Sequence, residues 1–210
     1  MPRVLQGLFI AEGTSDQPLA NTVEVLFRES GIELRLTVPP YEQLPKVAKT
    51  IKDRTEAGQR LMECIDVVVV HRDSDNVGHD VRREEIDSAM HSAGIGVWCP
   101  IVPVRMTEAW LLLDEKEIRR VAGNPKGRAS LGLPKRHEVE RVADPKEVLR
   151  KALLDASAAT GRRREREAKR FNSQRRQLLE GIDREGPLKE LSSWQQLLED
   201  VARSSRLLRP

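Results

Sequence analysis

The sequence predicts an α/β fold, with a mainly parallel sheet of four strands, helices on both of its faces and a helical extension at the C-terminal end. Short apolar segments alternate with helix-like segments up to residue 104, as in proteins whose strands are joined by right-handed crossovers. One segment, residues 65–70, is a nearly unbroken β-branched run, which is typical of a strand buried on both faces of a parallel sheet. Beyond residue 104 only helical patterns follow.

The first half of the chain contains the four expected strands. They cover residues 4–10, 32–38, 65–70 and 95–104. The helices between them are expected from Pro18 to Gly31, over residues 41–62 and over residues 80–92. Pro100 and Pro103 place the fourth strand near an edge of the sheet, because proline cannot donate a hydrogen bond to a neighbouring strand.

The second half is expected to be helical. One helix should run over residues 107–123 with Thr107 as its N-cap, and a basic, irregular connection should follow over residues 124–144. Asp144 should cap a helix that has Pro145 at its first position. A strongly basic helix is expected over residues 161–182, and a last one over 188–201. The expected domains are an α/β domain over residues 1–123 and a basic helical region over 124–210 that packs on it.

The composition restricts the class of protein. Hydrophobic residues make up 39% and charged residues 33%, which suits a globular core under a highly charged surface. Aromatic residues are only 3%, too few for a stacking platform that binds single-stranded nucleic acid. The first apolar stretch is short and reaches Glu12 early, so neither a signal peptide nor a membrane anchor is expected. Cys64 and Cys99 lack metal-type spacing, and we expect reduced thiols in a cytoplasmic protein.

The two halves differ in charge. Residues 1–114 contain 12 Lys and Arg and 18 Asp and Glu, a net charge of −6, whereas residues 115–210 contain 24 and 15, a net charge of +9. This asymmetry suggests that the first half binds cations and the second a polyanion, although solvated basic helix faces would give the same pattern. On the expected basic helix, one face can hold four side chains that would contact nucleic acid: Arg162, Arg166, Lys169 and Arg170.

Carboxylates follow the first and third expected strands. Glu12 and Asp16 come after the first, and Asp73 and Asp75 come after the third. Loops at the carboxyl ends of parallel strands converge on ligand sites, and alternate residues of an extended segment point the same way. Four clustered carboxylates require a cation, and oxygen ligands suit Mg²⁺ or Mn²⁺. The alternative is that they are ordinary helix-cap and turn residues.

A fifth acid, Glu108, follows the fourth expected strand. Its helix would begin at the same edge of the sheet, so Glu108 would complete a second metal site. Alternatively, it is an acidic residue in the first turn of a helix, where the helix dipole favours negative charge.

Two of these segments carry a family resemblance. The first strand and its loop read FIAEGTSD, and the third strand and its loop read VVVVHRDSD. Together they resemble the Toprim domain, in which a Glu follows the first strand and an Asp-x-Asp motif follows the third. Four further segments are similar to small bacterial Toprim-like proteins related to nucleases of the overcoming-lysogenisation-defect type: VPVRMTEAWLLLD, GRASLGLPKRHEVE, DPKEVLRKALL and PLKELSSWQQLLEDV.

The resemblance implies a Toprim-like fold and metal-dependent chemistry. Glu12 would be a general acid/base or metal ligand, and Asp73 and Asp75 would hold the metal. Asp16 would be a second contact to the metal. Topoisomerases of this class take a Tyr nucleophile from another domain. The only tyrosine here is Tyr41, and no such domain is expected, so we do not expect strand passage. Hydrolysis by a metal-activated water is expected instead.

We therefore expect a divalent-metal-dependent phosphodiesterase, a nuclease acting on DNA or RNA, with a role in phage defence suggested by the group it is similar to. Two alternatives stay open. The chain would be a non-catalytic or conditionally active partner of an ABC-type ATPase. Or it would be a phosphatase like the haloacid dehalogenases, whose Asp-x-Asp-x-Val motif would make Asp73 the nucleophile and Asp75 the acid. That fold normally begins with the motif-bearing strand, which is the third strand here.

Overall fold

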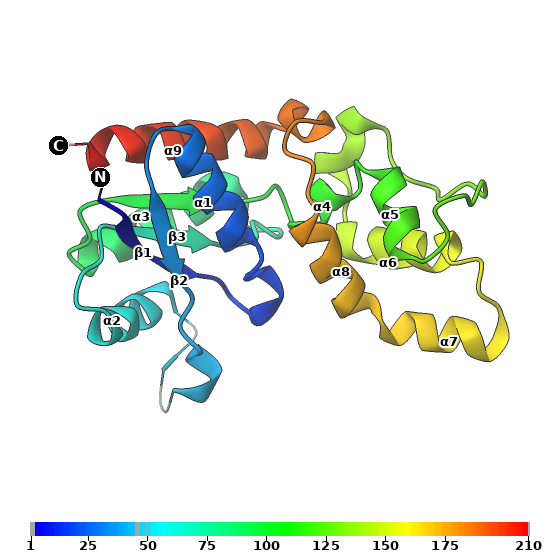
Figure 1. Ribbon diagram of the computed structural model, residues 1–210, viewed down its shortest axis with the longest axis horizontal. Coiled ribbons are helices and arrows are strands. Elements are labelled where there is room, and N and C mark those ends of the chain that lie inside the picture. Colours follow the sequence, from blue (N-terminus) through cyan, green and yellow to red (C-terminus); the bar gives the residue numbers. More distant parts are fainter. Residues whose placement is uncertain (1–2, 45–46, 49, 210) are drawn as a thin grey trace. The chain divides into compact units, whose positions relative to one another are not determined.

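The protein is described here by a computed structural model that covers residues 3–44, 47–48 and 50–209. Within it the four strands form one parallel sheet, in the order β2-β1-β3-β4 (Figure 1). The predicted α/β class and the edge position of the fourth strand are confirmed. The strands are β1 (Leu5–Ile10), β2 (Leu34–Thr37), β3 (Val67–His71) and β4 (Trp98–Ile101).

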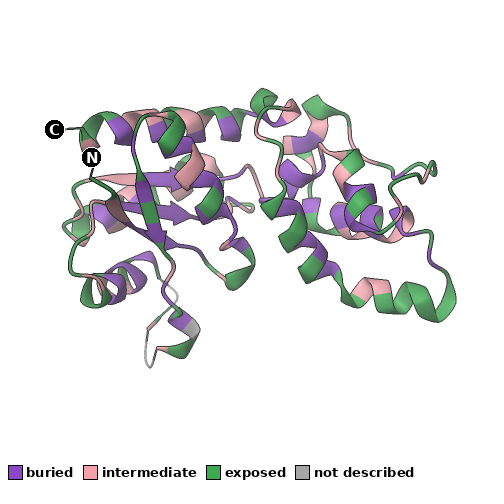
Figure 2. Cartoon of the chain, viewed as in Figure 1, coloured by how far each residue is buried: buried purple, intermediate pink, exposed green. Residues whose placement is uncertain are grey.

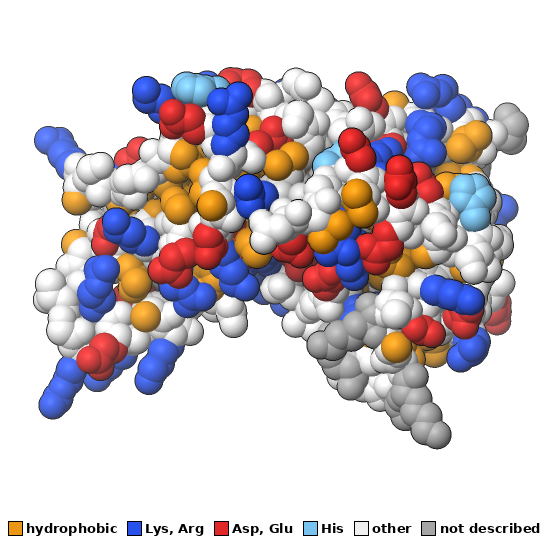
Figure 3. Space-filling view, turned by 180° about the vertical axis from the view of Figure 1, so that it is seen from behind, with side chains coloured by type: hydrophobic (Ala, Val, Ile, Leu, Met, Phe, Trp, Pro, Cys, Tyr) orange, Lys and Arg blue, Asp and Glu red, His pale blue; other side chains and the backbone are white. Residues whose placement is uncertain are grey.

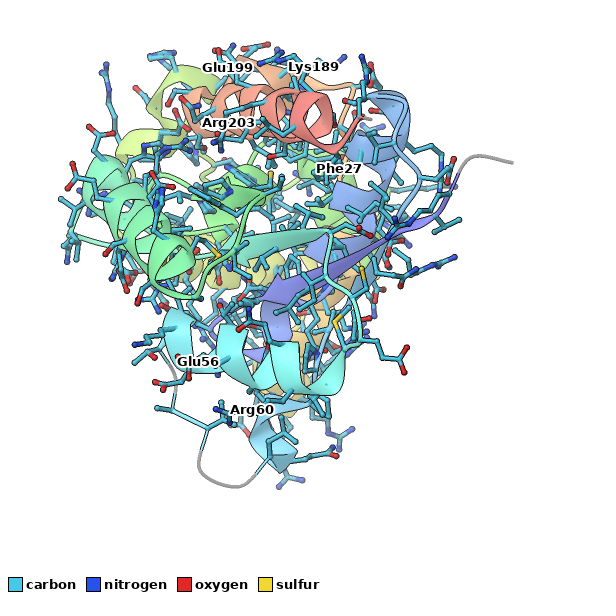
Figure 4. The ribbon with its side chains drawn as sticks, turned by 90° about the vertical axis from the view of Figure 1, so that its left-hand side faces the viewer. Phe27, Glu56, Arg60, Lys189, Glu199 and Arg203 are labelled. Atoms are coloured by element: carbon cyan, nitrogen blue, oxygen red, sulfur yellow. The ribbon has the colours of Figure 1, made fainter. Side chains whose placement is uncertain are left out.

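Helices cover both faces of the sheet. Against one face pack α2 (Ile51–Leu61) and α3 (His79–Ser92), whose apolar side chains join those of β1 and β3 in one core cluster. On the other side lie α1 (Leu19–Glu29) and the end of α9 (Ser192–Leu208), and Figure 4 shows α9 and α2 on opposite sides of the sheet. The strands of the sheet are largely buried between these helices (Figure 2). In β3, for example, all five residues are buried.

The expected helix over residues 41–62 is wrong in its first part. A 3₁₀ turn covers Tyr41–Gln43, and α2 begins only at Ile51, after Thr50 accepts a hydrogen bond from the backbone N–H of Asp53. A threonine that caps in this way starts a helix, so residues before it belong to a different segment. Residues 45–46 and 49, which the prediction also included, lie outside the described residues.

Two long helices of the prediction are each divided in the structure. The segment 107–123 forms α4 (Glu108–Leu111) and α5 (Glu115–Val121), because Asp114 accepts a hydrogen bond from the Glu117 N–H and starts a new helix. The basic segment forms α7 (Gly161–Lys169) and α8 (Phe171–Glu180). The bend at Arg170 separates a helix without buried residues from one that buries Phe171, Leu178 and Leu179.

The remaining helical segments follow the prediction more closely. Asp144 caps α6 (Pro145–Ala156) by accepting from the Glu147 N–H, as expected. Short 3₁₀ turns occur at Arg136–Arg141 and Pro187–Glu190. The last helix begins later than expected and runs to Leu208. No helix among the described residues is both long enough and apolar enough to cross a membrane.

The chain divides into two compact units, and neither is continuous in sequence. One consists of Met1–Arg72, Val77–Val102 and Gln196–Pro210, and contains the sheet; the other consists of Asp73–Asn76 and Pro103–Gln195. These bounds do not coincide with the expected division after residue 123. The reason is that α4 and α5 pack on α6 and α8, whereas the end of α9 belongs to the unit that contains the sheet.

Each unit has its own side-chain contacts. In the unit that contains the sheet, both carboxylate oxygens of Asp200 accept from Arg83, at 2.5 and 2.9 Å. In the helical unit, Trp110 and Trp194 stack edge to face with ring centroids 5.2 Å apart. Glu140 accepts hydrogen bonds from the N–H and O–H groups of Ser192 and Ser193 at the start of α9. Burial opposes ionisation of Glu140, but these four bonds outweigh it and lower its pKa.

Candidate active site

The carboxyl ends of β1 and β3 lie side by side. The two strands are parallel neighbours, and Ile10 is the register partner of Val70. Two residues beyond each partner, Glu12 and Arg72 form an ion pair, with 2.9 Å between the Glu12 Oε1 and Arg72 Nη1 atoms. Arg72 also lies 3.5 Å from Glu85 and is only 14% exposed. Glu12 therefore has a cationic neighbour from the adjacent strand end, and the sequence analysis missed this arginine.

Asp73 follows Arg72 directly and is held by the chain around Thr107. The Oδ1 atom of Asp73 accepts from both the backbone N–H and the hydroxyl of Thr107, at 3.0 and 3.1 Å. Thr107 is fully buried, so both donors are fixed by packing. This contact explains why Thr107 does not use its side chain to cap α4.

The next residues of the motif are held in the same way. The Ser74 hydroxyl accepts from the Arg105 N–H at 2.6 Å, and the Asp75 N–H donates to the Arg105 carbonyl at 2.8 Å. The Arg105 guanidinium donates to the Asn76 side chain at 2.9 Å. We call residues 73–76 and 103–107, with these bonds between them, the DxD clamp. It fixes the backbone of the Asp-x-Asp motif from a segment about 30 residues further along the chain.

The backbone of the DxD clamp is strained at two positions. Asp75 has a φ of 47° and Arg105 a φ of 61°, a left-handed conformation that costs L-residues with a side chain about 1 kcal/mol or more. The expected extended conformation of the motif is therefore wrong at Asp75. Strain of this kind persists only where neighbouring contacts enforce it, and it concentrates at functional sites.

The other two acids of the prediction lie in different surroundings. Asp16 ends the 3₁₀ turn Thr14–Asp16, is buried, and accepts from the Ser15 hydroxyl at 3.2 Å. Glu108 is the first residue of α4, and its Oε1 atom accepts from the Arg175 Nε at 2.8 Å. Both side chains of this pair are nearly inaccessible, at 3% and 5% exposed. The structure thus gives Glu108 a cationic partner, Arg175, from the basic half of the chain.

The five acids are divided between the two units. Glu12 and Asp16 belong to the unit that contains the sheet, and Asp73, Asp75 and Glu108 to the helical unit. Across the described ranges, no group of three or more His, Cys, Asp or Glu side chains is gathered closely enough to hold a metal ion. All five nevertheless offer carboxylate oxygens, the ligand type that Mg²⁺ and Mn²⁺ prefer. The donor chemistry fits the expected cation.

The predicted nucleic-acid contacts lie on α7 and at its end. Figure 2 shows α7 as almost entirely exposed, and it contributes no buried residue. Arg170 is engaged with Glu167, with 3.1 Å between nitrogen and oxygen, whereas Arg162, Arg166 and Lys169 make no ion pair with any described residue. Figure 3, seen from behind, shows Lys and Arg side chains that project at the lower left, where α7 lies. Three of the four predicted contacts thus carry a positive charge that no described carboxylate neutralises.

We compared the chain with protein-family profiles, with curated proteins and with solved structures, and none of them matches it.

Proposed function

We propose that the protein is a divalent-metal-dependent phosphodiester hydrolase with a Toprim-like arrangement, most simply a nuclease. The observation that carries the proposal is the position of Glu12 and of the Asp73–Asp75 motif directly after two neighbouring parallel strands. Open parallel sheets bind their ligands at this edge. The proposal requires that β1 and β3 are neighbours, as they are in this sheet.

The residues divide the chemistry between them. A divalent cation supplies charge for the phosphoryl oxygens and lowers the pKa of an attacking water. Asp73 and Asp75 would hold that cation, and the DxD clamp would fix their direction. Glu12 would take a proton, and Arg72 pairs with its carboxylate at 2.9 Å.

A matched set of substitutions tests the metal site. Asp73→Asn/Asp75→Asn should abolish Mn²⁺ binding in isothermal titration, while Asp80→Asn, at an exposed carboxylate in α3, should leave it unchanged. Glu12→Gln should abolish Mg²⁺-dependent cleavage of duplex DNA or RNA and leave the melting temperature within a few degrees of wild type. Equal Mn²⁺ affinity in the wild type and the double variant would exclude the site. Phosphatase activity without cleavage of nucleic acid would favour the haloacid-dehalogenase-like alternative.

The exposed basic face of α7 supports nucleic acid as the substrate. If it contacts the phosphate backbone, affinity for duplex DNA should fall by roughly 0.9 log units per contact for each ten-fold rise in salt. Reversal of Arg162, Arg166 and Lys169 to Glu should reduce that slope and leave Mn²⁺ affinity unchanged. An absence of salt-dependent binding to duplex DNA and RNA would rule out this role and leave the docking of a protein partner, such as an ABC-type ATPase.

A further inference from the structure

A buried arginine lies at the carboxyl end of β1, and no described residue offers it a carboxylate partner. Arg54, on α2, is only 5% exposed and makes no ion pair with any described residue. Its Nη1 donates to the Ala11 carbonyl, and its Nε is buried without a hydrogen-bond partner in the described part of the chain. Arginine does not lose its proton in proteins, so its charge stays inside the fold, where an uncompensated charge is costly.

Tyr41 presents a second unsatisfied donor beside it. The Arg54 guanidinium stacks over the Tyr41 ring, 5.0 Å from its centroid. The Tyr41 hydroxyl is buried and has no hydrogen-bond partner among the described residues. Burial raises the pKa of Tyr41 well above its ordinary value, although the Arg54 charge works against this. The hydroxyl therefore stays protonated and available as a donor.

Both residues line one small hollow next to the candidate active site. Ala11, Gly13 and Gln17, from the end of β1 and the loop after it, form the rest of its wall with Val38 and Pro39. Arg54 also lies near Glu12 and Arg72, across a gap that has no room for a water molecule. The hollow has a volume of about 10 Å³, which is enough for one oxygen atom.

We propose that Arg54 and Tyr41 bind an anionic oxygen of a phosphate group at this hollow and thereby hold the substrate beside Glu12. A phosphate oxygen would accept from both donors and supply the counter-charge that no described residue gives Arg54. Glu12 does not supply it, because its carboxylate is paired with Arg72. The proposal deepens the hydrolase function proposed above. The test below uses no divalent metal and measures no cleavage. The phosphate-binding proposal and the hydrolase proposal can therefore fail separately.

The test measures binding of inorganic phosphate by the rise in melting temperature at constant ionic strength, with chloride as the reference anion and a chelator present. Wild type should show a saturable rise. Arg54→Met, of similar shape and without charge, should lose the saturable rise and melt no lower than wild type in chloride. Tyr41→Phe should weaken phosphate binding about ten-fold. Arg60→Met is the matched control, because Arg60 lies on the same helix and projects away from the sheet (Figure 4).

Each contrary result has a distinct meaning. An absence of saturable stabilisation in wild type would mean that an ordered water satisfies the two donors, and the proposal would be wrong. Equal loss of the phosphate effect in Arg60→Met would assign that effect to general positive charge, such as that of α7.

A structural role for Arg54 predicts that Arg54→Met melts at a lower temperature than wild type in both phosphate and chloride. If that variant does not fold, unchanged phosphate affinity in Tyr41→Phe would still overturn the proposal. A dinucleotide with an internal phosphodiester should compete with phosphate, and its failure to compete would restrict the hollow to the free ion.

Discussion

The clearest test of how this chain uses its acidic residues is the substitution Glu108→Gln. The side chain is nearly isosteric and loses only the charge. If Glu108 were one of several clustered metal ligands, removing its charge would relieve repulsion and raise the melting temperature of the metal-free protein. The structure instead places Glu108 2.8 Å from Arg175, with both side chains buried. Removing its charge then leaves a buried guanidinium without this partner, and the expected change in stability has the opposite sign.

The magnitude follows from the burial. Breaking a buried ion pair from one side costs about 3–5 kcal/mol, and we take the lower end because the Gln oxygen can still accept from Arg175. For a chain of this length, about 3 kcal/mol corresponds to a fall of about 6–12 °C in melting temperature. The exposed pair Arg176–Glu180, on the same helix as Arg175, provides the control. There Glu180→Gln should cost less than about 0.5 kcal/mol.

The assay combines calorimetric melting with a Mn²⁺ titration of the same variants. Glu108→Gln should melt lower and keep its Mn²⁺ affinity. Replacing both partners, as Glu108→Leu/Arg175→Met, should recover most of the lost stability, because neither partner of the pair then leaves an unpaired buried charge. A Glu108→Gln variant that melts at or above the wild-type temperature and binds Mn²⁺ more weakly would refute this reasoning and make Glu108 a metal ligand.

Three further predictions concern single contacts. Glu140→Gln should destabilise the protein by about 1–2 kcal/mol at pH 7. Because the folded pKa of Glu140 is lowered, its contribution is complete above the unfolded pKa and is lost as pH falls through the folded value, so melting curves of variant and wild type should converge in acid. Thr107→Val should cost about 1 kcal/mol through the hydroxyl bond to Asp73 and weaken Mn²⁺ binding, whereas Thr107→Ser should restore both. Asp200→Asn should lower stability in urea unfolding by about 2 kcal/mol, because Arg83 loses its charged partner.

Local sequence signals predicted much of the fold. The β-branched run at Val67–Val70 identified an inner strand, because a strand buried on both faces favours a continuous apolar run. Asp144 followed by Pro145 identified the start of α6, since both residues favour a helix N-terminus. The start of α5 could have been found in the same way, because Asp114 precedes Glu117 at cap spacing. The bend at Arg170 has no such signal, since it depends on where Phe171 can be buried.

The candidate site depended on contacts that one sequence does not contain. Glu12 and the Asp-x-Asp motif could be placed because strand ends meet at one edge of a parallel sheet. The partners of these acids could not be predicted from the sequence. Arg72 reaches Glu12 across 60 residues, and Arg175 reaches Glu108 across 67. The left-handed conformation of Asp75 was equally hidden, because it is enforced by the Arg105 carbonyl and not by a glycine.

The division of α9 between the two units has a consequence for how the protein is made. Its last residues complete the unit that contains the sheet, where Ser204 bonds to the Trp98 carbonyl at 2.9 Å and Asp200 to Arg83. During synthesis, residues 103–195 therefore leave the ribosome before the sheet can acquire its final cover. The unit that begins first is therefore completed last, and until then α1 packs on that face of the strands without the end of α9. The nascent chain is thus most exposed to aggregation in the interval between the completion of β4 and the synthesis of residues 196–209.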